Sequence, residues 1–289
     1  MNKNWNGKTF GNGLMHRWLI CLLRWIDVRV IYAVTAVFIL PFCLPIKGRT
    51  VFRYFRHHHH YGVLRSLWAT YVNHCLFSQV VIDRFAMYAG KKFHVEMEGY
   101  EHFEQLAQQS EGFIQLSSHI GNYEIAGYTL VAKDKPFNAL VFFGEKESIM
   151  QGRSVRFADT NIKMIPVSDD MSHIFLIDDA LQHGETVSMP ADRLLGSSKT
   201  VEMPFLGGKA DFPQGPFRVA TMRGLNVLAV NVMKTSLTTY NIYIKPLSYD
   251  HSLPRNEQVK ALAAAYVKEL ERMMTMYPNQ WYNYFDFWK

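Results

Sequence analysis

The chain has 289 residues, with 31 Lys and Arg against 25 Asp and Glu, and a net charge of +6. It is 48% hydrophobic but only 19% charged, below the roughly 25% typical of soluble domains. These values exclude a peptide or a large repeat array, and they indicate either apolar surface that meets lipid or a large packed core. The basic excess suits anionic headgroups, a phosphorylated substrate or an acidic carrier protein, and nothing in it selects nucleic acid.

An apolar segment lies near the N-terminus, over residues 18–46, and three charged residues interrupt its first half: Arg24, Asp27 and Arg29. The part without charged residues, 30–46, is shorter than the about 20 residues of a usual bilayer span and has two prolines near its end. Basic residues flank both sides. This symmetry favours a helix or helical hairpin lying in the membrane interface over a single crossing. The alternative is a buried first helix of the globular domain.

Four consecutive histidines occupy residues 57–60. On a helix or a strand, adjacent side chains point in different directions, and no cysteine or carboxylate pair completes a ligand set. We therefore expect a solvated basic patch near lipid headgroups here, and no metal site.

We expect residues 61–289 to form one α/β domain with a mixed central sheet flanked by helices. Residues 1–60 are expected to form a membrane-anchoring segment that precedes it. Helical spacing of apolar residues marks residues 64–90, and an amphipathic stripe marks 257–277. Strand-like runs lie between these helices: Gly112–Ser117, Phe137–Phe143, Ile162–Val167, Glu185–Pro190, Leu225–Lys234 and Tyr240–Pro246. The last two are close together along the chain, which predicts an antiparallel hairpin at one end of the sheet.

The pair most suited to chemistry is His119 and Glu124, which follow an apolar strand-like run. Five positions apart, they fall on different faces of a regular helix, so they meet only across a turn, which Gly121 permits. An imidazole oriented by a carboxylate is a general base for a hydroxyl or amine nucleophile. The alternative is structural, with His119 filling the turn and Glu124 solvating the start of a helix.

No serine or cysteine nucleophile accompanies this pair. Ser117 and Ser118 precede His119, but the chain has no Gly-x-Ser-x-Gly elbow and no glycine-rich phosphate loop. Direct attack by a nucleophile on the substrate itself is therefore favoured over a covalent enzyme intermediate.

The block His119-Ile-Gly-Asn-Tyr-Glu124 resembles the HxGNxE form of the motif of the late acyltransferases of lipid A biosynthesis, within the wider group of glycerolipid acyltransferases. Other blocks resemble that family and follow in its order: Ile82-Asp-Arg84, Pro190-Ala-Asp-Arg193, Pro204-Phe-Leu-Gly207, residues 215–224 and Tyr277-Pro-Asn-Gln-Trp281. The resemblance covers almost the whole chain.

This resemblance implies a glycerolipid acyltransferase-like fold, with His119 as the general base and Glu124 as its orienting acid. The hydroxyl of a lipid A precursor or related glycolipid would attack the thioester of an acyl carrier protein or acyl-CoA. No cofactor and no metal is expected. The implied location is the cytoplasmic face of the bacterial inner membrane, with the membrane surface as a partner.

The same resemblance suggests residues that bind substrate. Arg153, and less clearly Arg156, lie where such enzymes often carry a basic residue for a phosphorylated acceptor, although exposed arginines often only solvate a helix. Asp192 and Arg193 match the aspartate block and would shape the acceptor or thioester pocket, or be a capping Asp with an outward Arg. Asn122 would fix the turn or donate to the oxyanion.

The end of the chain departs from the family, because aromatic residues over 282–288 replace a basic stretch. This leaves open a different acceptor for the same chemistry: a lysophospholipid, an aminoacyl lipid, or an aryl-polyene or flexirubin-type lipid. A non-catalytic lipid-binding membrane protein on the same fold is the alternative of another class.

Overall fold

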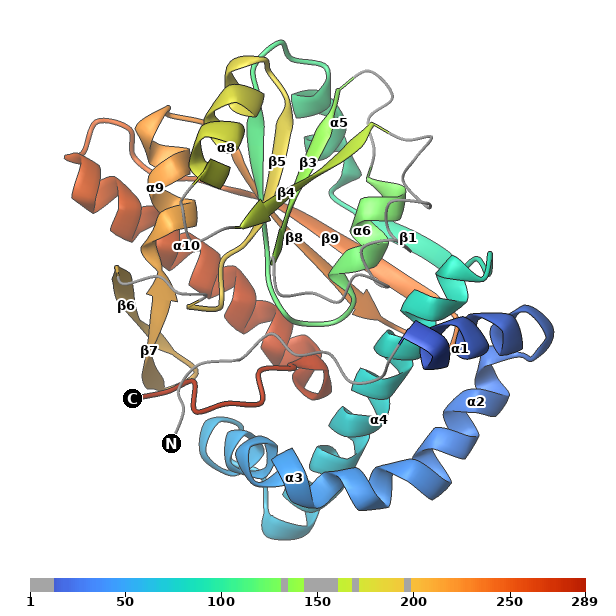
Figure 1. The fold of residues 1–289 in the computed structure, drawn as a ribbon. Helices are drawn as coiled ribbons and strands as arrows, with labels where there is room; N and C mark the ends of the chain where they lie inside the picture. Colours follow the sequence, from blue (N-terminus) through green and yellow to red (C-terminus); the bar gives the residue numbers. More distant parts are fainter. Residues whose placement is uncertain (1–12, 131–134, 143–160, 168–171, 195–198) are drawn as a thin grey trace.

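A computed structural model describes residues 13–130, 135–142, 161–167, 172–194 and 199–289. Its centre is a seven-stranded sheet in the order β1-β9-β8-β2-β5-β3-β4, with helices on both faces (Figure 1). The strands have these bounds: β1 His94–Glu98, β2 Phe113–Ser117, β3 Phe137–Phe142, β4 Ile162–Val167, β5 Thr186–Pro190, β8 Val227–Lys234 and β9 Thr239–Leu247. Among the described strands of this sheet, β8 and β9 pair antiparallel and the other neighbours pair parallel. The expected mixed α/β sheet and the antiparallel hairpin of β8 and β9 are confirmed, but the hairpin does not end the sheet, because β1 pairs with the outer side of β9.

Among the strands that sequence analysis identified, β2, β5 and β8 have mostly buried side chains. Every position of β8 is buried, which explains why its sequence, VLAVNVMK, is apolar apart from Asn231 and Lys234. In this sheet the sequence analysis missed β1, an edge strand with four of its five residues exposed, whose sequence HVEME has only two apolar residues.

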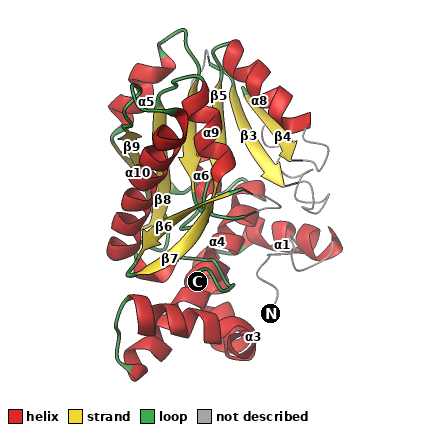
Figure 2. Ribbon diagram, turned by 90° about the vertical axis from the view of Figure 1, so that its left-hand side faces the viewer, coloured by secondary structure: helices red, strands yellow, loops and turns green. Residues whose placement is uncertain are grey.

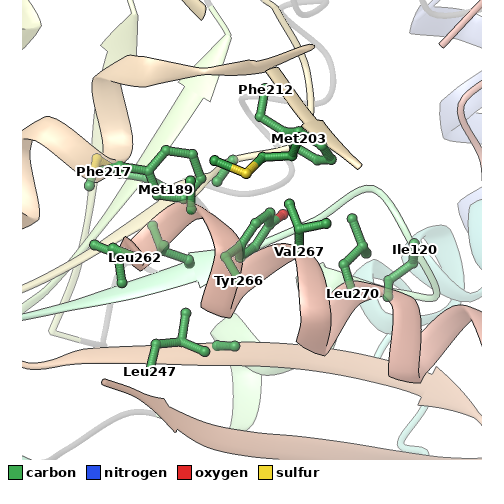
Figure 3. Close-up of a cluster of buried hydrophobic side chains, with 14 of the residues drawn as sticks. Ile120, Met189, Met203, Phe212, Phe217, Leu247, Leu262, Tyr266, Val267 and Leu270 are labelled. Atoms are coloured by element: carbon green, nitrogen blue, oxygen red, sulfur yellow. The ribbon is translucent and has the colours of Figure 1, made fainter. Parts of the chain in front are cut away.

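The helices divide between the two faces of the sheet. One face packs against α8 (Ser172–Gln182), α9 (Gln214–Met222) and α10 (Arg255–Met276), and Figure 3 shows Leu262, Tyr266 and Leu270 of α10 within this core. The other face packs against α5 (Tyr100–Ala107) and α6 (Tyr123–Thr129). Along β8, residues 227 and 229 belong to the first core and residues 228, 230 and 232 to the second, as the alternation of a strand requires.

A separate hairpin, β6 (Thr200–Phe205) and β7 (Gly208–Pro213), lies beside α10 (Figure 2). Its two turn residues, Leu206 and Gly207, have φ of 47° and 74°, as a type I′ turn requires. An isolated bridge from residue 210 to residue 288 joins the hairpin to the end of the chain.

The N-terminal region is a group of helices along α4 (Figure 1). These helices have the following bounds: α1 Gly13–Trp25, α2 Val28–Val34, η1 Thr35–Ile39, α3 Leu40–Arg53, η2 Tyr54–His58 and α4 Val63–Tyr88. Asp27, which interrupts the apolar segment, is the N-cap of α2. Its carboxylate accepts a hydrogen bond from the backbone N–H of Arg29 at 2.8 Å. Within the described residues, no helix combines the length and the apolar composition that crossing a bilayer requires.

The expected solvated patch of histidines is wrong for its two central members. The ring of His58 stacks on Trp288, with centroids 3.6 Å apart, and its Nδ1 lies 3.0 Å from the Leu206 carbonyl oxygen. His59 packs against Tyr54, and burial lowers the pKa of His59 to about 4. His58 thereby joins the N-terminal helices to Trp288 near the C-terminus, because imidazole stacks well on aromatic rings.

Candidate active site

Two side chains meet at the carboxyl end of the central strands because β2 and β5 are parallel and in register. Ser117, the last residue of β2, pairs with Pro190, the last of β5, and the N–H of Ala191 donates to the Ser117 carbonyl at 3.0 Å. Two residues further along each strand, His119 and Asp192 therefore face one another. The carboxyl ends of strands are where open α/β sheets place their ligands.

Asp192 holds His119 at two points. One carboxylate oxygen of Asp192 accepts from the backbone N–H of His119 at 2.9 Å, and the other lies 2.7 Å from Nδ1 of the ring. Since an ionised carboxylate only accepts, the proton of the neutral imidazole lies on Nδ1, and Nε2 carries the lone pair. The Asp192 side chain is fully buried, whereas that of His119 is 14% exposed, so a substrate can reach the ring.

The electrostatics favour a neutral imidazole beside an ionised carboxylate. Burial lowers the pKa of His119, and the charge of Arg193 lowers it further, against the opposing effect of Asp192. Burial alone would raise the pKa of Asp192, but the charge and hydrogen bond of His119 and the charge of Arg193 hold it well below its usual range. A neutral imidazole with a reachable lone pair can accept a proton from a hydroxyl.

In the structure the carboxylate that contacts Nδ1 of His119 belongs to Asp192, and not to Glu124 as the sequence analysis expected. Glu124 lies in the first turn of α6, where its carboxylate Oε1 is 2.9 Å from Nε of Arg84 on α4. Nδ1 of His119 is already bound to Asp192. The strand register, which brings in Asp192 from 73 residues away, decides the orienting acid, and the spacing within the motif does not.

The turn between His119 and α6 depends on Gly121, as expected. Its φ is +53°, and a Cβ added there would lie 1.8 Å from the carbonyl oxygen of Val232. The next residue, Asn122, is buried; its N–H donates to that same oxygen at 2.8 Å, and its side-chain amide lies 3.4 Å from the Tyr240 hydroxyl. These contacts support the first of the two expected roles of Asn122, fixing the turn.

Arg193 turns into the protein, which contradicts the alternative of an outward arginine beside a capping aspartate. Its Nε donates to Oδ1 of Asn283 at 2.7 Å, and its Nη2 donates to the Tyr282 carbonyl at 3.0 Å. Arg193 is thus part of the polar group around His119. The other two arginines expected to bind substrate, Arg153 and Arg156, lie outside the described residues.

The C-terminal segment contributes a residue that sequence analysis missed. Asn283 is fully buried, and its Nδ2 donates to the Asp192 carboxylate at 3.0 Å. Beside it, the N–H of Tyr282 donates to the His119 carbonyl at 3.2 Å. The available signal was a single amide side chain within the mostly aromatic residues 281–288, because a buried polar group there needs partners.

A second buried polar cluster also escaped sequence analysis. The carboxylate of Asp83 on α4 accepts from Nζ of Lys234 at 2.5 Å and from the hydroxyls of Tyr32 and Tyr240. Burial raises the pKa of Asp83 despite the opposing charge of Lys234. The cluster links α2 and α4 to strands β8 and β9, and Tyr240 connects it to Asn122 in the motif turn.

Comparison with models of protein families identifies the family of this chain. The family model described as bacterial lipid A biosynthesis acyltransferase matches residues 85–289. The crystal structure of the 1-acyl-sn-glycerophosphate (LPA) acyltransferase PlsC from Thermotoga maritima aligns with a TM-score of 0.42 and 17% sequence identity, covering 94% of this chain and 100% of that one. No curated protein matches the sequence.

Proposed function

Because the chain belongs to the bacterial lipid A biosynthesis acyltransferase family and is thus an acyltransferase of lipids, we propose that it acylates a hydroxyl of a lipid A precursor or related glycolipid. The donor in this proposal is the thioester of an acyl carrier protein or of acyl-CoA. The observation that carries the proposal is the imidazole of His119, whose Nδ1 is bound by a buried carboxylate and whose ring is open to a substrate.

In the proposed reaction, Nε2 of His119 removes the proton of the acceptor hydroxyl as its oxygen attacks the thioester carbonyl carbon. The carbon–oxygen bond forms, and the carbonyl oxygen takes up the negative charge. The intermediate then collapses, the carbon–sulfur bond breaks, and the imidazolium returns its proton to the departing thiolate. Asp192 stabilises the imidazolium between these two steps. The atoms and charges balance with no cofactor or metal, and none is part of the proposal.

Replacement of His119 tests this proposal. We expect His119→Ala to abolish acyl transfer while the protein stays folded, measured with the purified protein, an acyl carrier thioester or acyl-CoA, and a lipid A precursor. His94→Ala is the matched control, because this histidine lies on the exposed edge strand β1. Full activity of the His119→Ala protein would exclude His119 as the base.

A second acceptor class is favoured by the C-terminal segment. Residues 281–288 contain no lysine or arginine, and the side chains of Trp281, Tyr282 and Phe287 are buried in the protein. The segment therefore offers no cation to a phosphorylated lipid, which supports a less charged acceptor such as an aryl-polyene or flexirubin-type lipid alcohol, with a lysophospholipid or aminoacyl lipid as further candidates. Mass spectrometry of lipids from cells with and without the active protein distinguishes them. An unchanged lipid A acylation pattern would exclude the lipid A precursor.

We also propose that the N-terminal helices hold the protein against the cytoplasmic face of the bacterial inner membrane. Large apolar side chains are exposed on α1 and on the start of α4: Leu14, Met15, Trp18, Leu22, Trp25, Val63, Leu64, Leu67 and Trp68. Apolar side chains with tryptophans at such a surface suit the lipid interface. Co-sedimentation with anionic phospholipid vesicles tests this proposal, and we expect Trp18→Glu with Trp68→Glu to weaken binding. Unchanged binding of this double variant would contradict it.

A further inference from the structure

The side chain of Asn283 lies between the two charged groups that act on His119. Its Nδ2 donates to Oδ2 of Asp192 at 3.0 Å, and its Oδ1 accepts from Nε of Arg193 at 2.7 Å. The residue is 0% exposed. Both ends of one amide are therefore used, one on the orienting carboxylate and the other on the neighbouring guanidinium.

We propose that Asn283 is a positioning residue for the His119–Asp192 pair, holding the carboxylate against the imidazole and the guanidinium at a set place beside it. This inference deepens the proposed function and rests on His119 being the base. It gives the C-terminal segment a part in the chemistry: the site is completed only when this end of the chain is folded onto it.

An amide is the side chain that this place requires. The buried Asp192 carboxylate needs a donor at Oδ2, and Arg193 needs an acceptor at Nε, and only a primary amide of this length supplies both without adding charge. A leucine would leave both groups without that partner in a buried setting, which is costly. An aspartate would keep the contact with Arg193 but place a second carboxylate against the first.

The C-terminal segment is also anchored independently of Asn283. Asn73 on α4, also fully buried, donates from Nδ2 to the carbonyls of Asn279 and Trp281, at 3.0 and 2.8 Å. Its Oδ1 accepts from the hydroxyl of Tyr284 at 3.0 Å. Asn73 thus holds the same segment through a buried amide, and its hydrogen bonds go to Asn279, Trp281 and Tyr284 and not to His119 or Asp192, which makes it the matched control.

The loss of Asn283 has a defined electrostatic direction. Its hydrogen bond favours the ionised form of Asp192 and disperses that charge. Without it, the carboxylate charge acts more strongly on the imidazole, and Arg193, which lowers the pKa of His119, is released from its place. Both changes raise the pKa of His119. A base must be neutral to act, so the acid limb of the activity profile moves to higher pH.

The test compares Asn283→Leu with Asn73→Leu in the full-length protein. We expect Asn283→Leu to lower kcat by about 10-fold or more with little change in KM for the thioester, and to move the acid limb of kcat/KM to higher pH. Asn73→Leu is expected to lower the melting temperature while leaving that limb where it is in the wild type. Should Asn283→Leu fail to fold, Asn283→Asp keeps the volume and the contact with Arg193, and we expect a shift of the limb in the same direction.

A folded Asn283 variant with wild-type kcat and an unmoved acid limb would overturn the positioning role. The same shift of the limb in Asn73→Leu would also overturn it, because general loosening of the segment would then be the cause. These outcomes are distinct from failure of the proposed function. If the His119→Ala protein is active, His119 is not the base and the proposed function fails. If His119→Ala is inactive but the Asn283 variants behave like the wild type, only the positioning role of Asn283 is rejected.

Discussion

Two buried aspartates of this chain make similar ion pairs and serve different ends. Asp192 faces His119, and Asp83 faces Lys234, and both carboxylates are fully buried. The side chain of His119, the partner of Asp192, is 14% exposed, and its Nε2 is left for a substrate because Nδ1 is bound to Asp192. The side chain of Lys234 is 2% exposed, and its ammonium donates to Asp83 and Tyr32.

The difference in burial supports the proposal that the His119–Asp192 pair is reactive, whereas the Asp83–Lys234 pair is structural. The His119 side of the first pair opens at the carboxyl edge of the sheet, where a proton can be exchanged with a substrate. The second pair joins α4 to β8 across 151 residues of sequence, and tyrosine hydroxyls complete the coordination of Asp83. A buried pair of this kind specifies how elements meet, because its members tolerate few other arrangements.

The largest expected effect comes from breaking the reactive pair. Asp192→Asn keeps the shape but replaces an acceptor with an amide, so the imidazole loses both its fixed tautomer and the charge that stabilises its protonated form. We expect kcat to fall by roughly 10³-fold or more, by analogy with the same change in a Ser-His-Asp triad. Steady-state kinetics with a circular dichroism spectrum of the variant provides the measurement.

Glu124→Gln is the comparison that sharpens this prediction, because Glu124 pairs with Arg84 and not with the imidazole. Its loss of kcat should be clearly smaller than that of Asp192→Asn. Equal losses in the two variants would mean that Glu124 acts on His119 during turnover.

Breaking the structural pair should affect stability first. Lys234→Met leaves the Asp83 carboxylate buried without its cation, and we expect the free energy of unfolding to fall by about 3–5 kcal/mol. Adding Asp83→Leu to the same chain should restore part of this loss, since no buried charge then remains. Denaturant unfolding of the single and double variants measures both. A double variant less stable than Lys234→Met would show that the hydroxyls, and not the charge, dominate the cluster.

A smaller effect is expected from Gly121→Ala in the turn that carries the motif. The residue has φ +53°, and the added Cβ would collide with the Val232 carbonyl oxygen, so the turn must move. We expect a loss of about 1–3 kcal/mol in stability together with reduced activity. Gly207→Ala is the control, because Gly207 also has a positive φ but has nothing within 4 Å of the added Cβ. Equal losses would assign the effect to the backbone angle alone.

The smallest expected effect is a displacement of the pH profile. Burial and Arg193 lower the pKa of His119 below its ordinary value of 6.5, so activity should persist below that pH and fall only as the imidazole takes up a proton. Arg193→Gln removes a positive charge, which raises that pKa and moves the acid limb to higher pH. Arg193→Lys keeps the charge and should leave the limb nearer the wild-type position. A limb that moves to lower pH in Arg193→Gln would contradict the assignment.

Several features of the fold and site were accessible before the structure was known. Buried strands, the hairpin of β8 and β9, and the place of His119 after a strand all leave local patterns in the sequence. Glu124 was assigned to His119 because it is near in sequence, but the parallel register of β2 and β5 selects Asp192. Asn283 lies 91 residues beyond Asp192, and no local pattern connects the two. The division at residue 60 and the location at a membrane remain predictions.

The sequence by itself determined the class of fold and the family, and it singled out His119 as the candidate base, because hydrophobic periodicity and motif blocks are local properties of the sequence. Only the tertiary structure decided which acid meets His119, that Arg193 points inward, and that the aromatic C-terminal segment completes the site. Those contacts depend on strand register and on how the chain end packs across α4. Strand register and the packing of the chain end both depend on how side chains are buried throughout the core. No short stretch of sequence therefore predicts them.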